Sequence, residues 1–299
     1  DQATTDTQSS ALGGQADQPI NYIRNSVKAV VDAYDGSVKL YAWDETDPLL
    51  QTYSDAFPGT VLPRSDISPD LLQHLRYPED LFKVQRQLLG RYHVSDARVW
   101  YNGTDMWEVP VDPVQGNNGT KEPSYYLSIK WPGDANPVFS QTTVFVPRGR
   151  SNLASYLAVV AEATSPDYGK LRVLRMSDTH QIDGPGQTFN AINNDPKVAE
   201  TLRPFLNQGA ASATYGNLLT LPMGNGLLYV APVYTQRQGN NGSYPALAYV
   251  VVRFGSHVGI GSTLQQALDE VFSGDAGADT GEADFDQDDD HDPTGWGTP

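Results

Sequence analysis

The sequence predicts an α+β fold, in which mainly antiparallel sheets are flanked by peripheral helices. Short apolar runs of strand length recur along the 299-residue chain, and many are rich in Val, Tyr, Trp and Thr, which favour strands. Glycine-containing turns join several neighbouring runs, as in antiparallel hairpins. Stretches with helical periodicity are fewer, and they begin at recognisable capping residues.

The first predicted elements form a hairpin. Residues 27–33 and 38–43 are predicted strands, and Asp35-Gly36 between them suits a tight turn because these residues accept positive φ angles. Two short helices should follow. Ser68 is a suitable N-cap with Pro69 at the first helical position, and a second helix begins at Pro78 and ends at Gly90.

Most of the middle of the chain is predicted to be strand. These strands cover residues 98–109, 125–131, 142–146, 157–161 and 171–176. A helix then begins at Asp195-Pro196, and Pro204 should end or kink it, because proline lacks the backbone N–H that a helix needs.

A second hairpin is the centre of the predicted fold. Residues 218–221 and 227–233 are almost continuously apolar, so each should be buried on both faces, and the turn lies at residues 224–226. A strand over 244–254 and a helix over 264–272, capped by Ser262 or Thr263, complete the expected elements.

The net charge of −16 comes mostly from the two ends of the chain. Residues 275–292 carry nine acids and residues 1–19 carry three, with no Lys or Arg in either stretch, which leaves 24 acidic against 20 basic residues between 20 and 274. Nucleic acid is therefore not an expected partner, since binding to it depends on clustered Lys and Arg. Residues 1–19 and 275–299 are predicted to be a disordered lead and an acidic disordered tail. Residues 20–274 are predicted to form a single α+β domain, and a division into two subdomains is left open.

Cysteine is absent, which excludes disulfides, thiolate nucleophiles and Cys-based metal sites. No apolar run approaches the roughly 18 residues that span a bilayer, so we expect this chain to be a soluble fragment. Cysteine usage does not indicate a compartment, because its absence fits both the cytosol and a bacterial extracytoplasmic domain.

No catalytic or cofactor motif stands out. The five histidines are scattered without the spacing of a zinc protease, and Gly255-Ser-His-Val-Gly259 only imitates a hydrolase elbow, so no catalytic residue, metal or cofactor is assigned. Gly184-Pro-Gly186 and Gly224-Asn-Gly226 are interpreted as turns. Residues 183–187 precede an unusually polar segment, residues 190–195, and polar loops held by a rigid sheet often carry binding sites. The one candidate ligand site is therefore formed by Asp183, Gln187 and Asn217.

Several long phrases occur in order between residues 20 and 274. They are Asn21-Tyr-Ile-Arg-Asn-Ser-Val-Lys28, Val31-Asp-Ala-Tyr-Asp-Gly36, Phe57-Pro-Gly-Thr60, Leu75-Arg-Tyr-Pro-Glu-Asp-Leu-Phe-Lys-Val-Gln85, Arg91-Tyr-His-Val94, Gly184-Pro-Gly186 and Gly216-Asn-Leu-Leu219. In them the chain closely resembles the uncharacterised protein family 0182. The resemblance implies a large bacterial membrane protein, with several transmembrane helices in its N-terminal half and an extracytoplasmic region, similar to this chain, after them. It implies no established activity, cofactor or catalytic residue.

These observations favour an extracytoplasmic binding, sensing or assembly domain of a multi-pass membrane protein rather than an enzyme. An envelope glycan- or lipid-acting hydrolase and the substrate-capturing domain of a transporter are the alternatives. The expected location is the extracytoplasmic side of a bacterial cell membrane, which the protein would reach through transmembrane helices absent from this chain. A protein partner and a homo-oligomer both stay open.

Overall fold

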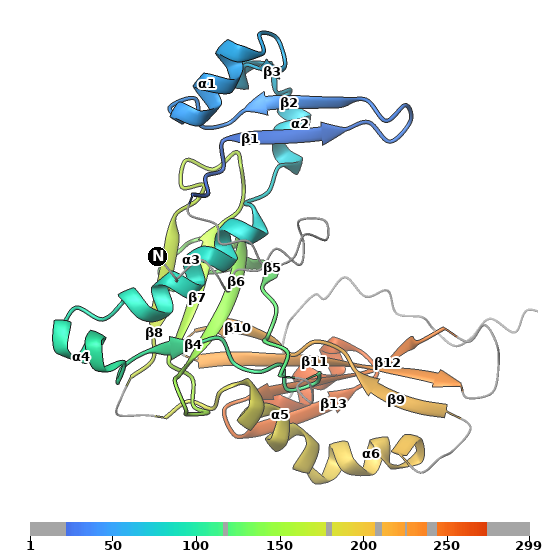
Figure 1. Ribbon diagram of the computed structural model, residues 1–299. Helices are drawn as coiled ribbons and strands as arrows, with labels where there is room; N and C mark the ends of the chain where they lie inside the picture. Colours follow the sequence, from blue (N-terminus) through green and yellow to red (C-terminus); the bar gives the residue numbers. More distant parts are fainter. Residues whose placement is uncertain are drawn as a thin grey trace, which may run out of the picture. The chain divides into compact units, whose positions relative to one another are not determined.

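The computed structural model describes residues 22–115, 119–177, 181–206, 211–224, 226–237 and 244–273. The chain divides into two compact units, Asp1–Asn194 with Asn217–Tyr229 and Asp195–Gly216 with Val230–Pro299, which we call unit 1 and unit 2. Helices combined with mainly antiparallel sheets confirm the predicted α+β class (Figure 1). The predicted disordered ends at 1–19 and 275–299 lie outside the described residues, and the single domain over 20–274 stays a prediction.

Unit 1 begins with a three-stranded sheet in the order β1-β2-β3. Strand β1 (Val27–Val31) runs antiparallel to β2 (Val38–Ala42), and β3 (Val61–Leu62) is parallel to β2. The predicted hairpin is confirmed, and Gly36 in its turn has a φ of 74°, a conformation that glycine adopts without strain.

Two short helices flank this sheet. Helix α1 (Pro48–Ala56) was not predicted, and Asp47 caps it by accepting a hydrogen bond from the Leu49 N–H. A 3-10 turn, η2 (Arg64–Asp66), leads to α2 (Pro69–His74). The predicted cap of α2 is confirmed, because Ser68 Oγ accepts a hydrogen bond of 3.2 Å from the Leu71 N–H.

Helix α3 (Glu79–Tyr92) begins where expected but passes through Gly90, so the prediction that Gly90 ends it is wrong. Gly90 is buried, and a Cβ there would lie 2.6 Å from the carbonyl oxygen of Trp107. The glycine therefore allows the helix and the neighbouring backbone to approach closely, which is a packing role.

The predicted strand over residues 98–109 is also wrong in its first half, where the chain forms α4 (Ala97–Asn102). Asp96 caps its start by accepting hydrogen bonds from the N–H groups of Arg98 and Val99. Gly103 ends it with a φ of 64°. These two terminal signals outweigh the strand preference of the aromatic and β-branched residues between them.

A five-stranded antiparallel sheet in the order β4-β6-β7-β8, with β5 also paired to β6, forms the core of unit 1. Its strands are β4 (Trp107–Glu108), β5 (Tyr125–Ile129), β6 (Val138–Pro147), β7 (Ser155–Val160) and β8 (Leu171–Arg175). Helix α3 covers one face, where Phe82 packs with Phe145, Leu157 and Val159 (Figure 1). The four predicted strands from residue 125 onward are confirmed.

The Gly184-Pro-Gly186 segment does not form a turn. It opens helix α5 (Pro185–Asn194), which also contains most of the polar stretch that we expected to be a loop. Thr188 and Ile192 are fully buried on its inner side. Further along unit 1, β10 (Leu219–Met223) pairs with β11 (Gly226–Arg237), which confirms the central hairpin.

In unit 2, β11 is flanked by β9 and β12, and β12 pairs antiparallel with β13. The strands are β9 (Ala211–Tyr215), β12 (Ala246–Phe254) and β13 (His257–Gly261), and the helices are α6 (Pro196–Leu206) and α7 (Leu264–Phe272). Helix α6 continues through Pro204 to Leu206, so Pro204 does not end it, and the alternative of a kink stays a prediction. The predicted N-cap of α7 was Ser262 or Thr263, and the structure has Thr263 in that position.

Candidate functional site

The three residues predicted to bind a ligand belong to two separate segments. Asp183 and Gln187 lie on either side of Gly184, at the start of α5, and Asn217 is exposed between β9 and β10. The Gln187 side chain accepts a hydrogen bond of 3.2 Å from the Gly184 N–H, and the Asp183 carbonyl accepts one of 2.7 Å from Tyr229 Oη. These contacts stabilise the beginning of the helix, and a ligand site at these residues stays a prediction.

A cavity of about 290 Å³ lies between α1 and the first sheet, and we call it the α1 groove. Its walls are mostly apolar, with Val27 and Leu40 contributed by the sheet and Leu49, Tyr53 and Phe57 by α1 and its C-cap. For comparison, an apolar cavity of about 150 Å³ is already large enough to bind benzene. The groove therefore has the size and the lining of a site for apolar groups.

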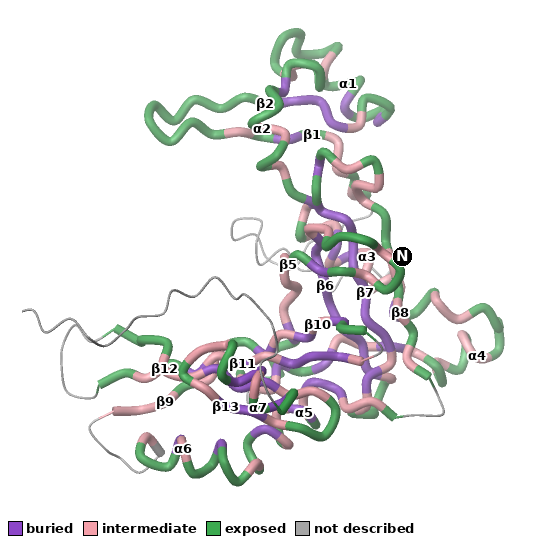
Figure 2. The backbone as a smooth tube through the Cα atoms, turned by 180° about the vertical axis from the view of Figure 1, so that it is seen from behind, coloured by how far each residue is buried: buried purple, intermediate pink, exposed green. Residues whose placement is uncertain are grey.

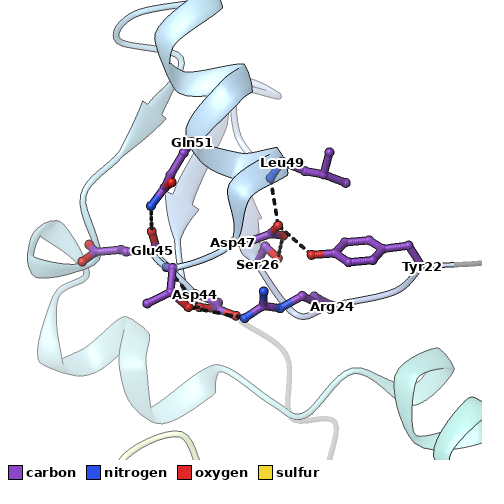
Figure 3. A network of polar contacts seen from close by, with 9 residues as sticks. Tyr22, Arg24, Ser26, Asp44, Glu45, Asp47, Leu49 and Gln51 are labelled. Carbon is purple, nitrogen blue, oxygen red and sulfur yellow. Dashed lines mark hydrogen bonds and ion pairs between the residues drawn. The ribbon is translucent and has the colours of Figure 1, made fainter.

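A polar network fixes the first turn of α1 at one end of the groove (Figure 3). Buried Asp47 accepts hydrogen bonds from Tyr22 Oη at 2.8 Å, from Ser26 Oγ and from the Leu49 N–H at 3.0 Å. The Ser26 hydroxyl, followed by that of Tyr22 and the Leu49 N–H, lowers the pKa of the Asp47 carboxyl. Because three donors already occupy this carboxylate, its role is to hold the helix in place.

A second polar pair lies next to this network. Arg24 forms an ion pair with Asp44, and the Thr46 hydroxyl donates a hydrogen bond of 2.6 Å to the same carboxyl group. These interactions, with that of Thr46 the largest, lower the pKa of Asp44. The rim of the groove at this end is therefore charged and hydrogen-bonded, whereas its walls are apolar.

The apolar lining continues along the hairpin. Paired residues of an antiparallel ladder lie on the same face, and the pairs Val27–Ala42, Ala29–Leu40 and Val31–Val38 place six apolar side chains on one side. We call this the outer face. Val31 and Val38 are 63% and 59% exposed, and Figure 2 shows this end of the hairpin as exposed. Helix α1 covers only the opposite end of the hairpin (Figure 1).

The inner face of the same hairpin packs against the rest of unit 1 around Lys28, whereas nearer the turn Val30 and Lys39 line a second cavity of about 590 Å³. Lys28 is buried, and its ammonium donates hydrogen bonds to the Arg76 carbonyl at 2.7 Å and to Tyr168 Oη at 3.1 Å. It also lies 5.3 Å from the centre of the Trp43 ring. Burial lowers the pKa of Lys28 to about 8. The hairpin is thus anchored on its inner face at Lys28, at the end away from the turn.

Two buried carboxyl groups lie beside the five-stranded sheet. Burial, reinforced by the charge of Asp112, raises the pKa of Glu122 to about 8. Arg86 is close to this pair, because its guanidinium donates a hydrogen bond of 3.4 Å to the Glu122 carbonyl oxygen. Paired carboxyls with a raised pKa are typical of general acid catalysis, but Glu122 is only 4% exposed, so a substrate could not reach it without local opening.

Sequence reasoning missed the α1 groove because α1 itself was missed. Asp47-Pro48 has the same cap-then-proline pattern as Ser68-Pro69, and it was the one available signal for this helix. The described residues contain no group of three or more His, Asp or Glu side chains that could hold a metal ion. Within the same residues, no helix combines the length and the apolar character needed to cross a membrane.

The chain is similar to curated proteins that are considerably longer than it is. It is 52% identical over 277 residues to a UPF0182 protein of Thermobifida fusca, 49% identical over 294 residues to one of Kocuria rhizophila and 48% identical over 276 residues to one of Streptomyces coelicolor. These matches cover 92%, 93% and 92% of this chain but 27%, 30% and 27% of the relatives. The chain therefore spans less than a third of their length.

No solved structure matches the chain significantly. The family model described as "Uncharacterised protein family (UPF0182)" matches residues 2–205. This match covers more than half of the sequence, and relatives at about half identity agree with it. The chain therefore belongs to the uncharacterised protein family UPF0182.

Proposed function

We propose that this chain is a binding or assembly region without catalytic activity, on the extracytoplasmic side of a multi-pass bacterial membrane protein. The single observation that carries the binding role is the α1 groove with the outer face beside it. There the chain leaves the apolar side chains of a well-formed sheet uncovered. Contiguous exposed apolar surface of this kind marks interaction sites more often than catalytic ones.

The membrane context rests on the sequence resemblance described above and on the length of the relatives. More than two thirds of each relative lies outside the region that this chain matches, which leaves ample length for membrane-spanning segments. The outer face then provides the contact with whatever the whole protein binds.

The groove is not suited to hydrolysis. Asp47 is its one charged lining residue among those described, and that carboxylate is already occupied by three donors. Glycoside hydrolysis needs two free carboxyl groups on opposite sides of a substrate. An envelope glycan hydrolase therefore has no comparable support.

The location can be tested with the cysteine-free sequence of the chain. A Tyr101→Cys exchange at a side chain that is 84% exposed provides a unique label site when it is made in an otherwise cysteine-free full-length protein. We expect a membrane-impermeant maleimide to label this site in intact cells. Labelling that occurs only after lysis would place the region in the cytoplasm and would disprove the extracytoplasmic part of the proposal.

The binding role has a separate test. Thermal denaturation of the 299-residue chain is measured with cell-wall fragments, lipids and amphipathic peptides, because a bound ligand raises the melting temperature by mass action. We expect at least one of these three classes of ligand to raise the melting temperature of the chain without being chemically converted. Release of products from a glycan or lipid substrate, abolished by Glu122→Gln, would instead support the hydrolase.

A further inference from the structure

We infer that the occupant of the α1 groove is a basic amphipathic α-helix of a partner protein, which lies on the outer face beside α1. This inference rests on the proposed binding role and gives it a specific kind of partner. Three features of the described residues support it: the half-covered sheet face, an apolar ridge on α1 and the balance of charge around the first sheet.

The sheet face has room for a second helix. A sheet with one apolar face normally packs against helices along its full extent, which buries that face in a two-layer arrangement. Here α1 covers the end of the hairpin where β1 begins and β2 ends, while the turn end extends beyond it (Figure 1). Ala29, Val31 and Val38 are exposed on the uncovered part. A helix laid beside α1 would complete the layer.

Helix α1 presents a ridge to the same space. Leu49, Tyr53 and Phe57 follow one another at intervals of four residues, so they lie along one side of the helix. They are 50%, 64% and 60% exposed, and all three line the groove. Ridges of this spacing pack into the grooves of a neighbouring helix. An extended peptide paired to the edge of β1 would leave this ridge uncovered, which favours a helix as the occupant.

The charge around the groove selects the polar side of that helix. Residues 22–62, which build the first sheet and α1, carry six acids and three bases. Lys28 is buried on the inner face, where Lys39 also lies, and Arg24 is paired with Asp44. Asp32 and Asp35 are exposed in the turn, next to the uncovered end of the outer face. Lys or Arg on the flanks of the incoming helix would complement these acids.

The same charge argues against two other occupants. A second copy of the chain would bring the acids of two hairpins together, and like charges across an interface oppose association. An anionic membrane surface attracts basic segments and would be repelled by the exposed Asp32 and Asp35. A basic helix is the occupant that complements both the apolar ridge and these acids.

The test uses the full 299-residue chain and a synthetic helix of leucine and lysine, with Leu at positions i, i+3, i+4 and i+7. Two control peptides are needed, one with the same composition in scrambled order and one with Glu in place of Lys. Binding of the labelled peptides is measured by fluorescence anisotropy at low and high salt. We expect the patterned basic peptide to bind more tightly than both controls, and its affinity to fall with added salt.

The decisive variant is Tyr53→Asp. It adds a negative charge, so attraction by charge alone predicts equal or tighter binding of the basic peptide. Docking on the ridge instead predicts a loss of at least about tenfold, because an exposed aromatic anchor is removed. Tyr101→Asp is the matched control, since it makes the same exchange at a side chain that is 84% exposed on α4. This control should leave the affinity unchanged. Thermal denaturation verifies that both variants are folded.

Three results would overturn the inference. The first is equal binding by the scrambled peptide or by the Tyr53→Asp variant. The second is a dimer of the unmodified chain, seen by light scattering, that Tyr53→Asp dissociates, because the occupant would then be a second copy. The third is co-sedimentation with anionic vesicles that Tyr53→Asp abolishes, because the surface would then bind lipid. The last two results would leave the binding role itself intact, whereas substrate turnover would disprove that role.

Discussion

The three-stranded and five-stranded sheets of unit 1 differ in how far their apolar faces are covered by other elements. In the five-stranded sheet, β6 and β7 are buried along nearly their full length, and α3 covers one face (Figure 2). In the first sheet, the outer face of β1 and β2 is largely exposed, although its residues are equally apolar. Apolar composition alone therefore does not distinguish a buried face from an exposed one. The presence or absence of a covering helix does.

The largest loss of stability is expected from a substitution in the core between α3 and the five-stranded sheet. Phe82 of α3 is fully buried in its core, and Phe82→Ala should lower the free energy of unfolding by about 3–5 kcal/mol, because it removes apolar contacts and leaves a cavity. Urea denaturation followed by circular dichroism measures this change. A loss below about 1 kcal/mol would show that α3 is not essential to this core.

A smaller loss is expected where α3 approaches the backbone of β4. A Cβ at Gly90 would lie 2.6 Å from the Trp107 carbonyl oxygen, so Gly90→Ala should destabilise the chain by about 1–3 kcal/mol. Gly186→Ala is the matched control, since a Cβ at that helical position meets nothing within 4 Å. The control should be neutral or slightly stabilising. Equal effects of the two exchanges in urea denaturation would contradict the close packing.

The buried carboxyl group beside the five-stranded sheet should give the stability of the chain a pH dependence of its own. The pKa of Glu122 is about 8 in the folded chain against an ordinary value of 4.5, so the folded state holds an extra proton between these values. Stability from this group is greatest below pH 4.5 and is lost as the pH rises through 8. Glu122→Gln removes this dependence, so its gain in stability over the unmodified chain should grow from pH 5 to pH 9.

Urea denaturation at pH 5, 7 and 9 tests this expectation, and Asp55→Asn controls for the loss of one exposed charge. If the Glu122→Gln curve runs parallel to that of the unmodified chain, the carboxyl is already ionised in the folded state. Such a result would also remove the main reason for considering Glu122 as a general acid.

The smallest effect on stability is expected at the open ridge. Tyr53 is 64% exposed, so Tyr53→Ser should change the free energy of unfolding by no more than about 0.5 kcal/mol. A loss of several kcal/mol in urea denaturation would mean that the ridge is already covered in the chain alone. The contrast between the two sheets would then disappear.

Local signals in the sequence were sufficient for most strands and for the caps of α2 and α7. The failures have physical reasons. Residues 97–102 have strand-like composition, but Asp96 and Gly103 supply a helix cap at each end. Gly90 has the residue type of a helix end, yet its role is set by a backbone that is distant in sequence. In α4 the capping residues at the two ends determine the structure, and at Gly90 a contact with a distant part of the chain does; residue composition alone predicts neither.

The candidate site was harder to predict than the fold. Asp183 and Gln187 were chosen because a polar loop was expected, and the segment that follows Gly184 is helix α5 instead. The α1 groove consists of apolar residues from four separate segments, each of which resembles ordinary core when taken alone. Whether such residues are covered depends on the tertiary arrangement, and a hydrophobic pattern carries no information about that.

Lys28 gives the two faces of β1 different evolutionary constraints. Its contacts with Arg76 and Tyr168 tie the inner face to distant parts of the same polypeptide, so a substitution there requires compensation within the chain. Val27, Ala29 and Val31, which alternate with the inner-face residues, would instead contact the proposed partner helix. Across relatives, the inner positions should therefore vary with one another, and the outer positions should vary with the sequence of a second protein.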